Sequence, residues 1–258
     1  MITTSLALAQ WTWLGELSRH NISAYIVVDM DETALSFLSN GVTVISIHHS
    51  VSTSIGYHSS STKDEHSKKR ADAWDKSLLY FAEIATKYEF VWFIEDDVYI
   101  YSLLSFLRVH EDAMRAKADL ASKDLISKHS KKYQRQYLKQ PVFVSLVPAV
   151  GVSRQILLEI RRFVAQYHQL EYIEIMFPTL AMQHNLSVYR PSQLRTIKFR
   201  CNYSCEDLFN MRDQWLHPIK DQMHFVQDCE DSVYDVAHVG NYSLYKNTDG
   251  YHHLGKCA

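Results

Sequence analysis

The chain has 258 residues, of which 47% are hydrophobic and 22% charged, so it can bury the core of one large domain or two small ones and is not intrinsically disordered. Its 27 basic residues nearly balance its 29 acidic ones, so no overall positive field is available to hold a nucleic acid, which we exclude as a main partner. The seven glycines are too scattered to form a G-x-G-x-x-G turn or a Walker A loop, which excludes the common dinucleotide and P-loop sites.

No stretch of the chain has the sequence of a membrane-spanning helix. Its apolar runs fall short of about 18 residues, and residues 1–14 lack the basic flank of a signal peptide. We therefore expect a soluble protein of the cytoplasm, or of the host cytoplasm if the chain is viral. N-x-S glycosylation sequences begin at Asn21, Asn185, Asn202 and Asn241, which suits a secretory lumen and keeps that location open if an N-terminal anchor is missing. The four cysteines, which allow a disulfide, are Cys201, Cys205, Cys229 and Cys257.

Strand-like and helix-like segments alternate along the chain. Apolar, β-branched runs predict buried strands at residues 24–28, 42–47, 90–94 and 142–147. Apolar residues at helical spacing predict helices between them, at residues 68–87, at 102–120 and from Ser153 onward. This alternation is typical of an α/β fold with a largely parallel sheet, in which ligands bind beyond the carboxyl ends of the strands.

Three parts of the chain lack such periodicity. Residues 52–69 are rich in Ser, His and Lys, and residues 123–139 carry six Lys or Arg, so both are predicted to be solvated and mobile. The last quarter of the chain combines many aromatics with all the cysteines. It is predicted to be irregular structure packed on the domain.

The sequence Glu95-Asp96-Asp97 directly follows the apolar run 90–94 and is the strongest local sign of a functional site. Three carboxylates at the end of a buried strand repel one another and lose hydration, unless a cation or hydrogen-bond donors neutralise them. A divalent ion held by oxygen ligands and substrate phosphates does this. The alternative is a purely structural acidic turn.

An apolar strand that ends in Glu-Asp-Asp resembles the DxD-type site of GT-A glycosyltransferases. Two further segments support the resemblance: residues 73–76, Ala-Trp-Asp-Lys, lie upstream on a predicted helix, and residues 217–220, His-Pro-Ile-Lys, lie near the C-terminus. The resemblance implies a single GT-A-like, Rossmann-like domain, a three-layer α/β/α sandwich with a mostly parallel central sheet. Residues 1–100 would form the nucleotide-binding half, and residues 101–258 the acceptor-binding half with the irregular C-terminal segment.

The resemblance also implies a reaction, in which a sugar moves from a nucleotide-sugar donor to a hydroxyl group of a glycan or glycoprotein acceptor, with Mn²⁺ or Mg²⁺ as cofactor. The chain is similar to the small glycosyltransferases of large algal viruses, which suggests a UDP donor such as UDP-xylose. Asp97 and His217 are the implied metal ligands, while Glu95 and Asp96 address the ribose or water on the ion. The implied donor-binding residues are Asp29, Asp31, Trp74, Asp75, Lys76, Glu95, Asp96 and Lys220.

An inverting transfer needs a base near the acceptor hydroxyl group. Glu174 occupies the place where similar inverting enzymes carry an acid before a helix, and Glu171 is the substitute. Pro178 suits the first position of a helix, so we expect Glu174 to precede that helix and to point into the cleft. The structural alternative is an acid that stabilises the positive end of the helix.

The segment around Asp29 supports a competing hypothesis. Residues 29–33, Asp-Met-Asp-Glu-Thr, resemble the DxDxT motif of haloacid-dehalogenase-type Mg-dependent phosphatases, in which the first Asp attacks phosphorus and the second, here Asp31, serves as acid and base. Asp96 and Asp97 would then be the metal-binding acids. A convincing lysine motif between these segments is absent, so we rank this hypothesis second. A catalytically inactive carbohydrate-binding or scaffold protein is the third possibility.

Overall fold

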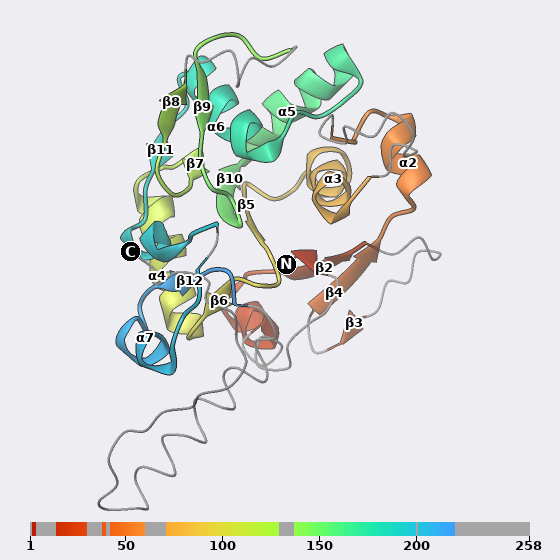
Figure 1. The fold of residues 1–258 in the computed structure, drawn as a ribbon. Helices are drawn as coiled ribbons and strands as arrows, with labels where there is room; N and C mark the ends of the chain where they lie inside the picture. The colour runs from red at the N-terminus through yellow and green to blue at the C-terminus, as the bar shows by residue number, and fades with distance from the viewer. Residues whose placement is uncertain are drawn as a thin grey trace, which may run out of the picture.

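The computed structural model describes residues 2–3, 14–29, 38–39, 42–59, 71–128, 137–199 and 201–219. This part of the chain is a mixed α/β structure with two four-stranded and two two-stranded sheets (Figure 1). Among these residues, no helix combines the length and the apolar character needed to cross a membrane.

The first four-stranded sheet is built mainly from parallel pairs. Its strand order is β1 (Ile2–Thr3), β2 (Ala24–Val28), β4 (Val42–Ser46) and β3 (Leu38–Ser39). β2 runs parallel to both β1 and β4, while β3 pairs with β4 antiparallel. Helix α3 (Ala73–Leu79) packs against β1 and β2. The two strands predicted in this region are confirmed.

The second four-stranded sheet is mostly antiparallel. Its strand order is β11 (Val188–Tyr189), β7 (Leu120–Ala121), β10 (Ala149–Ser153) and β5 (Phe90–Ile94). β10 is antiparallel to both of its neighbours, and only β11 and β7 are parallel. The prediction of a mostly parallel central sheet is wrong for this sheet, because an apolar run indicates a buried strand but not its direction. β10 itself, which contains Gly151, was not predicted.

Two small sheets and the other helices complete the described part of the fold. The two small sheets pair β6 (Tyr99–Ile100) with β12 (Trp215–Leu216), and β8 (Ile126–Lys128) with β9 (Val142–Val144). The other helices are α2 (His49–Ser54), the π-helix η2 (Tyr80–Ile84), α4 (Leu103–Arg115), α5 (Arg154–Tyr167), α6 (Ile173–Gln183), α7 (Cys205–Asn210), and the 3-10 helices η1 (Leu17–His20) and η4 (Ser192–Thr196). Segments 52–69 and 123–139, predicted to be solvated and mobile, contain the end of α2 and all of β8.

Polar residues set the beginnings of the predicted helices. Asp72 caps α3 by accepting a hydrogen bond from the Asp75 N–H at 2.9 Å, and Ser102 and Ser153 cap α4 and α5 with their hydroxyl groups. α4 is shorter than predicted because Lys117 takes a left-handed conformation, with φ of 49°, and the chain then enters β7. The helix predicted at 68–87 begins later, and its second half is π-helical.

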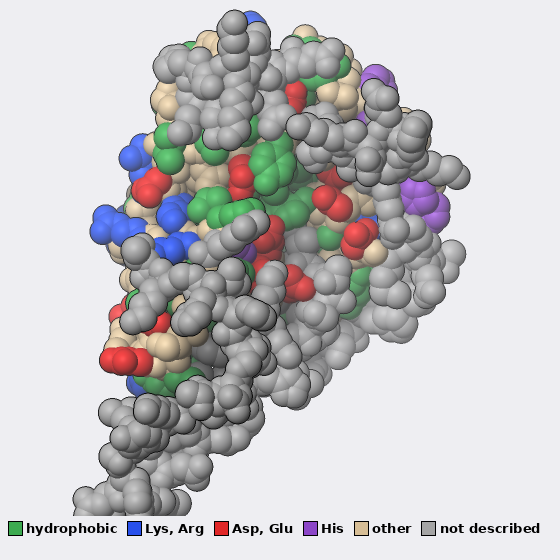
Figure 2. All heavy atoms as spheres, in the orientation of Figure 1, with side chains coloured by type: hydrophobic (Ala, Val, Ile, Leu, Met, Phe, Trp, Pro, Cys, Tyr) green, Lys and Arg blue, Asp and Glu red, His purple; other side chains and the backbone are tan. Residues whose placement is uncertain are grey.

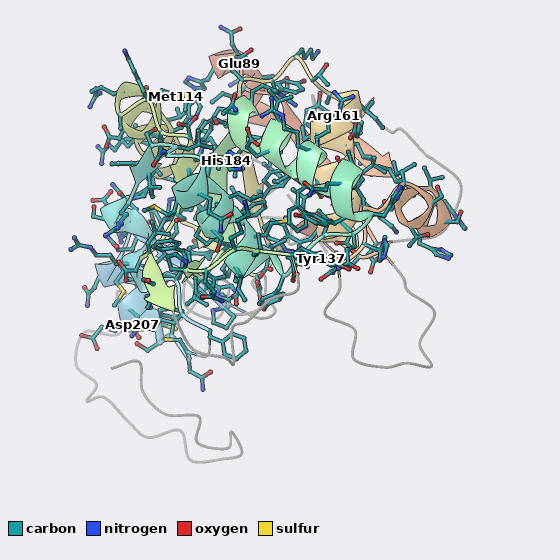
Figure 3. All side chains as sticks on the ribbon, turned by 90° about the horizontal axis from the view of Figure 1, so that it is seen from above. Glu89, Met114, Tyr137, Arg161, His184 and Asp207 are labelled. Atoms are coloured by element: carbon teal, nitrogen blue, oxygen red, sulfur yellow. The ribbon has the colours of Figure 1, made fainter. Side chains whose placement is uncertain are left out.

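The largest hydrophobic core joins the second sheet to α3, α5 and α6. Phe93 of β5 stacks on Phe177 of α6 with ring centroids 6.4 Å apart, and Trp74 of α3 packs against the same Phe93 at 5.8 Å. Figure 3 looks down on α5, where the labelled Arg161 Nε lies 3.0 Å from Glu83 Oε2 of η2. The contacts among Trp74, Phe93 and Phe177 fix α3, β5 and α6 against one another, and the candidate site is built from the ends of these three elements.

Candidate functional site

A tight turn and a small sheet bring distant parts of the sequence together at the carboxyl end of β5. The Val98 N–H donates to the Glu95 carbonyl oxygen at 3.2 Å, which closes the turn after β5. The chain continues into β6, which pairs antiparallel with β12. His217 directly follows β12, and the Ile219 N–H donates to the Asp97 carbonyl oxygen at 2.9 Å. His217 is therefore held beside the acidic turn.

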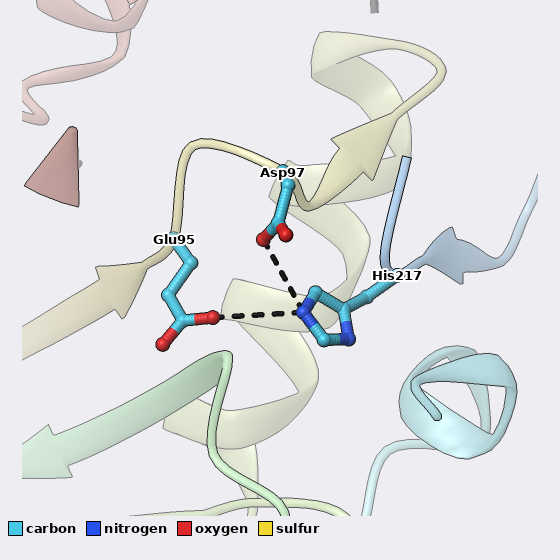
Figure 4. A group of neighbouring side chains, drawn as sticks. All are labelled: Glu95, Asp97 and His217. Atoms are coloured by element: carbon cyan, nitrogen blue, oxygen red, sulfur yellow. Dashed lines mark ion pairs between the residues drawn. The ribbon is translucent and has the colours of Figure 1, made fainter. Parts of the chain in front are cut away.

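Glu95, Asp97 and His217 form a group that can hold a metal ion (Figure 4). The Nε2 atom of His217 lies 3.2 Å from Asp97 Oδ1 and 3.5 Å from Glu95 Oε2. One possible ligand atom from each residue lies within 4.8 Å of the other two. Two carboxylates and one imidazole match the ligand preferences of Mn²⁺, and three protein ligands leave coordination positions for water or substrate oxygens.

The surroundings of His217 fit the role of a metal ligand. Its Nδ1 atom lies 2.6 Å from the Lys198 carbonyl oxygen, so Nδ1 carries a proton and Nε2 faces the carboxylates. Burial alone would lower the pKa of His217, but hydrogen bonds to Asp97 and Glu95 outweigh burial and raise the pKa to about 9. Without a metal, an imidazolium therefore supplies the positive charge that the two carboxylates require.

The amino end of α3 forms a second wall of the site. Trp74 Nε1 donates to Glu95 Oε1 at 2.9 Å, so one oxygen of this carboxylate is held by α3 while the other faces His217. Asp72 and Asp75 form a reciprocal capping box at this helix end. Burial raises the pKa of Asp75 to about 8, and the charge of Asp72 contributes to the increase. A protonated Asp75 reduces the repulsion among the acids at neutral pH.

A cavity of about 340 Å³ connects the metal group with the amino ends of α3 and α6. Its acidic and histidine lining residues are Asp72, Asp75, Glu95, Asp97, Glu174 and His217. Figure 2 shows acidic side chains gathered near the centre of this face, beside hydrophobic ones. A second cavity, of about 300 Å³, is lined mainly by apolar side chains of β2, β5 and α4, so it is poorly suited to an anionic nucleotide.

Glu174 lines the cavity from the first turn of α6. Our prediction that Pro178 begins this helix is wrong, since α6 begins at Ile173 and contains Pro178. Pro178 has no N–H to donate to the Glu174 carbonyl oxygen, and the Ser145 N–H donates to that oxygen instead at 2.9 Å. Burial raises the pKa of Glu174, a hydrogen bond with Tyr172 opposes this, and the charge of Glu95 raises the pKa further.

Asp29 and Lys76 form an ion pair that links the end of β2 to α3. Lys76 Nζ lies 3.1 Å from Asp29 Oδ1; the lysine side chain is fully buried, and the aspartate side chain is 27% exposed. Neither residue is among those that line the cavity of the metal group. Lys76 nevertheless directly follows Trp74 and Asp75 in α3, and both of these residues line the cavity.

The structure does not bring every predicted site residue into the cavity. Asp96 is half-buried and Glu171 is buried, and neither lines it. Asp31 and Lys220 lie outside the described residues. Conversely, Asp72 lines the cavity and was not predicted, although the D-x-x-D sequence at 72–75 is typical of a capping box and could have indicated it.

Comparisons with known proteins give no family assignment, since no protein-family model and no curated protein matches the chain significantly. Any functional assignment therefore depends on the geometry of the site and on the motifs in the sequence.

Proposed function

We propose that the chain is a metal-dependent, GT-A-like glycosyltransferase that moves a sugar from a nucleotide-sugar donor, such as UDP-xylose, to a hydroxyl group of a glycan acceptor. Mn²⁺ or Mg²⁺ is the proposed cofactor. The observation that carries the proposal is the convergence of Glu95, Asp97 and His217 after β5. Glu174 lines the same cavity, so a metal and a base would act on one bound substrate pair.

The charges of the site favour a donor that arrives with a cation. A nucleoside diphosphate is anionic, so Glu95 and Asp97 repel it unless a positive charge lies between them. Glu95, Asp97 and His217 would hold a divalent ion at this place, and that ion would supply positive charge against the charge that develops on the leaving diphosphate. We assign nucleoside binding to Asp29, next to Lys76, and an additional contact with the diphosphate to Lys220.

Glu174 is the proposed general base of an inverting transfer. Its raised pKa makes it a better proton acceptor than an exposed glutamate. In the reaction the acceptor oxygen forms a bond to the anomeric carbon and the bond from that carbon to the diphosphate breaks. The proton of the acceptor hydroxyl group passes to the Glu174 carboxylate. Attack opposite the leaving group inverts the anomeric configuration.

Calorimetry of UDP binding in EDTA and in Mn²⁺ tests the metal role. We expect weak binding in EDTA and binding at least about tenfold tighter in Mn²⁺, which corresponds to about 1.4 kcal/mol. Asp97→Asn should abolish this difference, because it removes a ligand of the metal group. Asp96→Asn is the matched control and should retain the difference, since Asp96 belongs to the same turn but not to the metal group. Equal affinity in EDTA and Mn²⁺ for the unmodified chain would refute the proposal.

The phosphatase hypothesis has one supporting observation, the contact of Lys76 with Asp29. This contact supplies a lysine near the aspartate that would attack phosphorus, whereas the sequence shows no convincing lysine motif of this kind. We test it with p-nitrophenyl phosphate and Mg²⁺, and we expect no hydrolysis. Magnesium-dependent phosphate release that Asp29→Asn eliminates would reverse the ranking of the two functions.

A further inference from the structure

Two of the N-x-S sequences present their asparagine on the surface in the same backbone conformation. Asn21 follows η1 and Asn185 lies just after α6, and both take the left-handed region, with φ of 58° and 54°. Both residues are exposed. Within the described ranges, neither side-chain amide has a hydrogen-bond partner. Both asparagines are therefore accessible on the surface at turns, without side-chain hydrogen bonds to other described residues that an attached sugar chain would break.

The serine hydroxyl group of each N-x-S sequence is free in the unfolded chain and contacts other residues in the folded chain. Ser187 Oγ accepts a hydrogen bond from the Asp119 N–H at 2.9 Å and lies 3.1 Å from the Asp119 carboxylate. Ser23 likewise interacts with the hydroxyl groups of Tyr25 and Tyr88, an interaction that acts to lower the pKa of both tyrosines. An enzyme that recognises the serine hydroxyl group must therefore act on the chain before these contacts form.

The cysteines supply an independent indication of the compartment. Cys201 and Cys205 are both disulfide-bonded. Disulfides persist in oxidising compartments such as the lumen of the endoplasmic reticulum and are rare in the cytosol. N-x-S sequences are modified in secreted proteins, which fold in that same lumen. The two observations thus agree on one compartment, which differs from the cytoplasmic location expected from the sequence.

We infer that Asn21 and Asn185 are N-glycosylation sites, modified in an oxidising secretory lumen while the chain is still unfolded. The side-chain amide nitrogen forms a bond to the anomeric carbon of an oligosaccharide, and the bond from that carbon to a lipid pyrophosphate breaks. The lipid pyrophosphate leaves, and one amide proton passes to a base. Asn202 is also exposed but lies between Cys201 and Cys205, where glycan addition and disulfide formation compete. The inference does not depend on the proposed function.

The test uses the full chain behind a cleavable secretory signal, translated with endoplasmic reticulum microsomes. Peptide N-glycosidase converts each glycosylated Asn to Asp, so peptide mass mapping reads every site separately. We expect conversion at Asn21 and Asn185, and loss of one glycan in each of the variants Asn21→Gly and Asn185→Gly. Glycine suits these variants because it adopts positive φ without strain. Asn210→Gly, at an exposed asparagine outside any N-x-S sequence, should change no glycan.

Two outcomes would overturn the inference. The first is unmodified Asn21 and Asn185 in chains that have entered the microsomes, with entry shown by signal cleavage and protection from added protease. This readout does not require the chain to fold, so a misfolded variant still gives an answer. The second is reaction of both Cys201 and Cys205 with a thiol reagent before reduction, because free thiols would remove the argument for an oxidising compartment.

Discussion

Asp75 is a carboxyl group that the fold keeps protonated into the neutral range. It is 2% exposed, and burial together with the charge of Asp72 raises its pKa from 3.8 to about 8. In the unfolded chain the group ionises at its ordinary pKa, so the folded chain holds the additional proton between about pH 4 and pH 8. The stability that this proton confers is complete below about pH 4 and is lost as the pH rises through about 8.

Asp75→Asn should remove this pH dependence. Asparagine keeps an oxygen that can accept the two hydrogen bonds, each 3.2 Å long, from the Ser59 and Asp72 N–H groups, but it has no carboxyl proton to lose. We expect the free energy of unfolding to decrease less between pH 5 and pH 8 than in the unmodified chain, by up to about 1.4 kcal/mol per pH unit. Urea denaturation at several pH values measures it. The control Asp213→Asn, at a side chain 74% exposed, should keep the unmodified slope.

Glu174→Gln tests the proposed base. The substitution keeps the shape of the side chain but cannot accept a proton, so kcat should fall about 10²- to 10⁴-fold while the Kd for UDP and Mn²⁺ stays nearly unchanged. Glu171→Gln is the control, because Glu171 lies close in sequence but does not line the cavity. Single-turnover assays with a UDP-sugar separate chemistry from binding. Unchanged turnover with a lower melting temperature would assign Glu174 a structural role.

At the scale of elements, the close packing of β10 against β5 requires a glycine at position 151. Gly151 pairs with Trp92 of β5, and a Cβ atom at Gly151 would lie 2.5 Å from Phe90 Cε1. Gly151→Ala therefore overpacks this contact and should lower the free energy of unfolding by about 1–3 kcal/mol. Phe90→Leu in the same chain should recover part of this loss. A double-mutant cycle by urea denaturation measures the coupling. Strictly additive effects of the two substitutions would contradict this prediction, because they would show that the alanine side chain at position 151 does not press on Phe90.

At the scale of the whole molecule, the candidate site depends on a segment that has its own small core. Residues 201–219 pack Leu208, Leu216 and Ile219 around Tyr99. The Tyr203 hydroxyl group donates to the His217 carbonyl oxygen at 3.2 Å, so this segment positions the histidine of the candidate metal group. The site therefore combines β5 from the first half of the chain with α6 and this segment from the second.

The disulfide bonding of Cys201 and Cys205 should affect metal binding more than it affects the rest of the fold. Loss of a native disulfide costs about 2–5 kcal/mol in small domains, and here the loss acts on the segment that holds His217. The double substitution Cys201→Ser with Cys205→Ser should weaken Mn²⁺ binding at least about tenfold and leave far-UV circular dichroism nearly unchanged. Electron paramagnetic resonance of free Mn²⁺ measures the affinity. Asp213→Asn, in the same segment, should bind Mn²⁺ as the unmodified chain does.

The sequence by itself determined the features that depend on a few neighbouring residues. Apolar runs predicted β2, β4 and β5, and capping residues such as Ser153 marked where helices begin. Glu95 and Asp97 were identified because charges at the end of a buried strand need compensation. His217 was linked to them only through the resemblance to a family, since the sequence holds no local signal of that contact.

Only the tertiary structure decided the features that depend on partners distant in the chain. The direction of β10 follows from its pairing between β5 and β7. The early start of α6 is stabilised by the Ser145 N–H, which donates to the Glu174 carbonyl oxygen that Pro178 leaves unpaired. Ser145 lies outside α6, so the sequence of the helix alone could not predict this contact. His217 faces Glu95 and Asp97, and not Asp96, because β6 pairs with β12. Backbone preferences act over a few residues, whereas strand direction, burial and electrostatic contacts arise only when distant segments pack together.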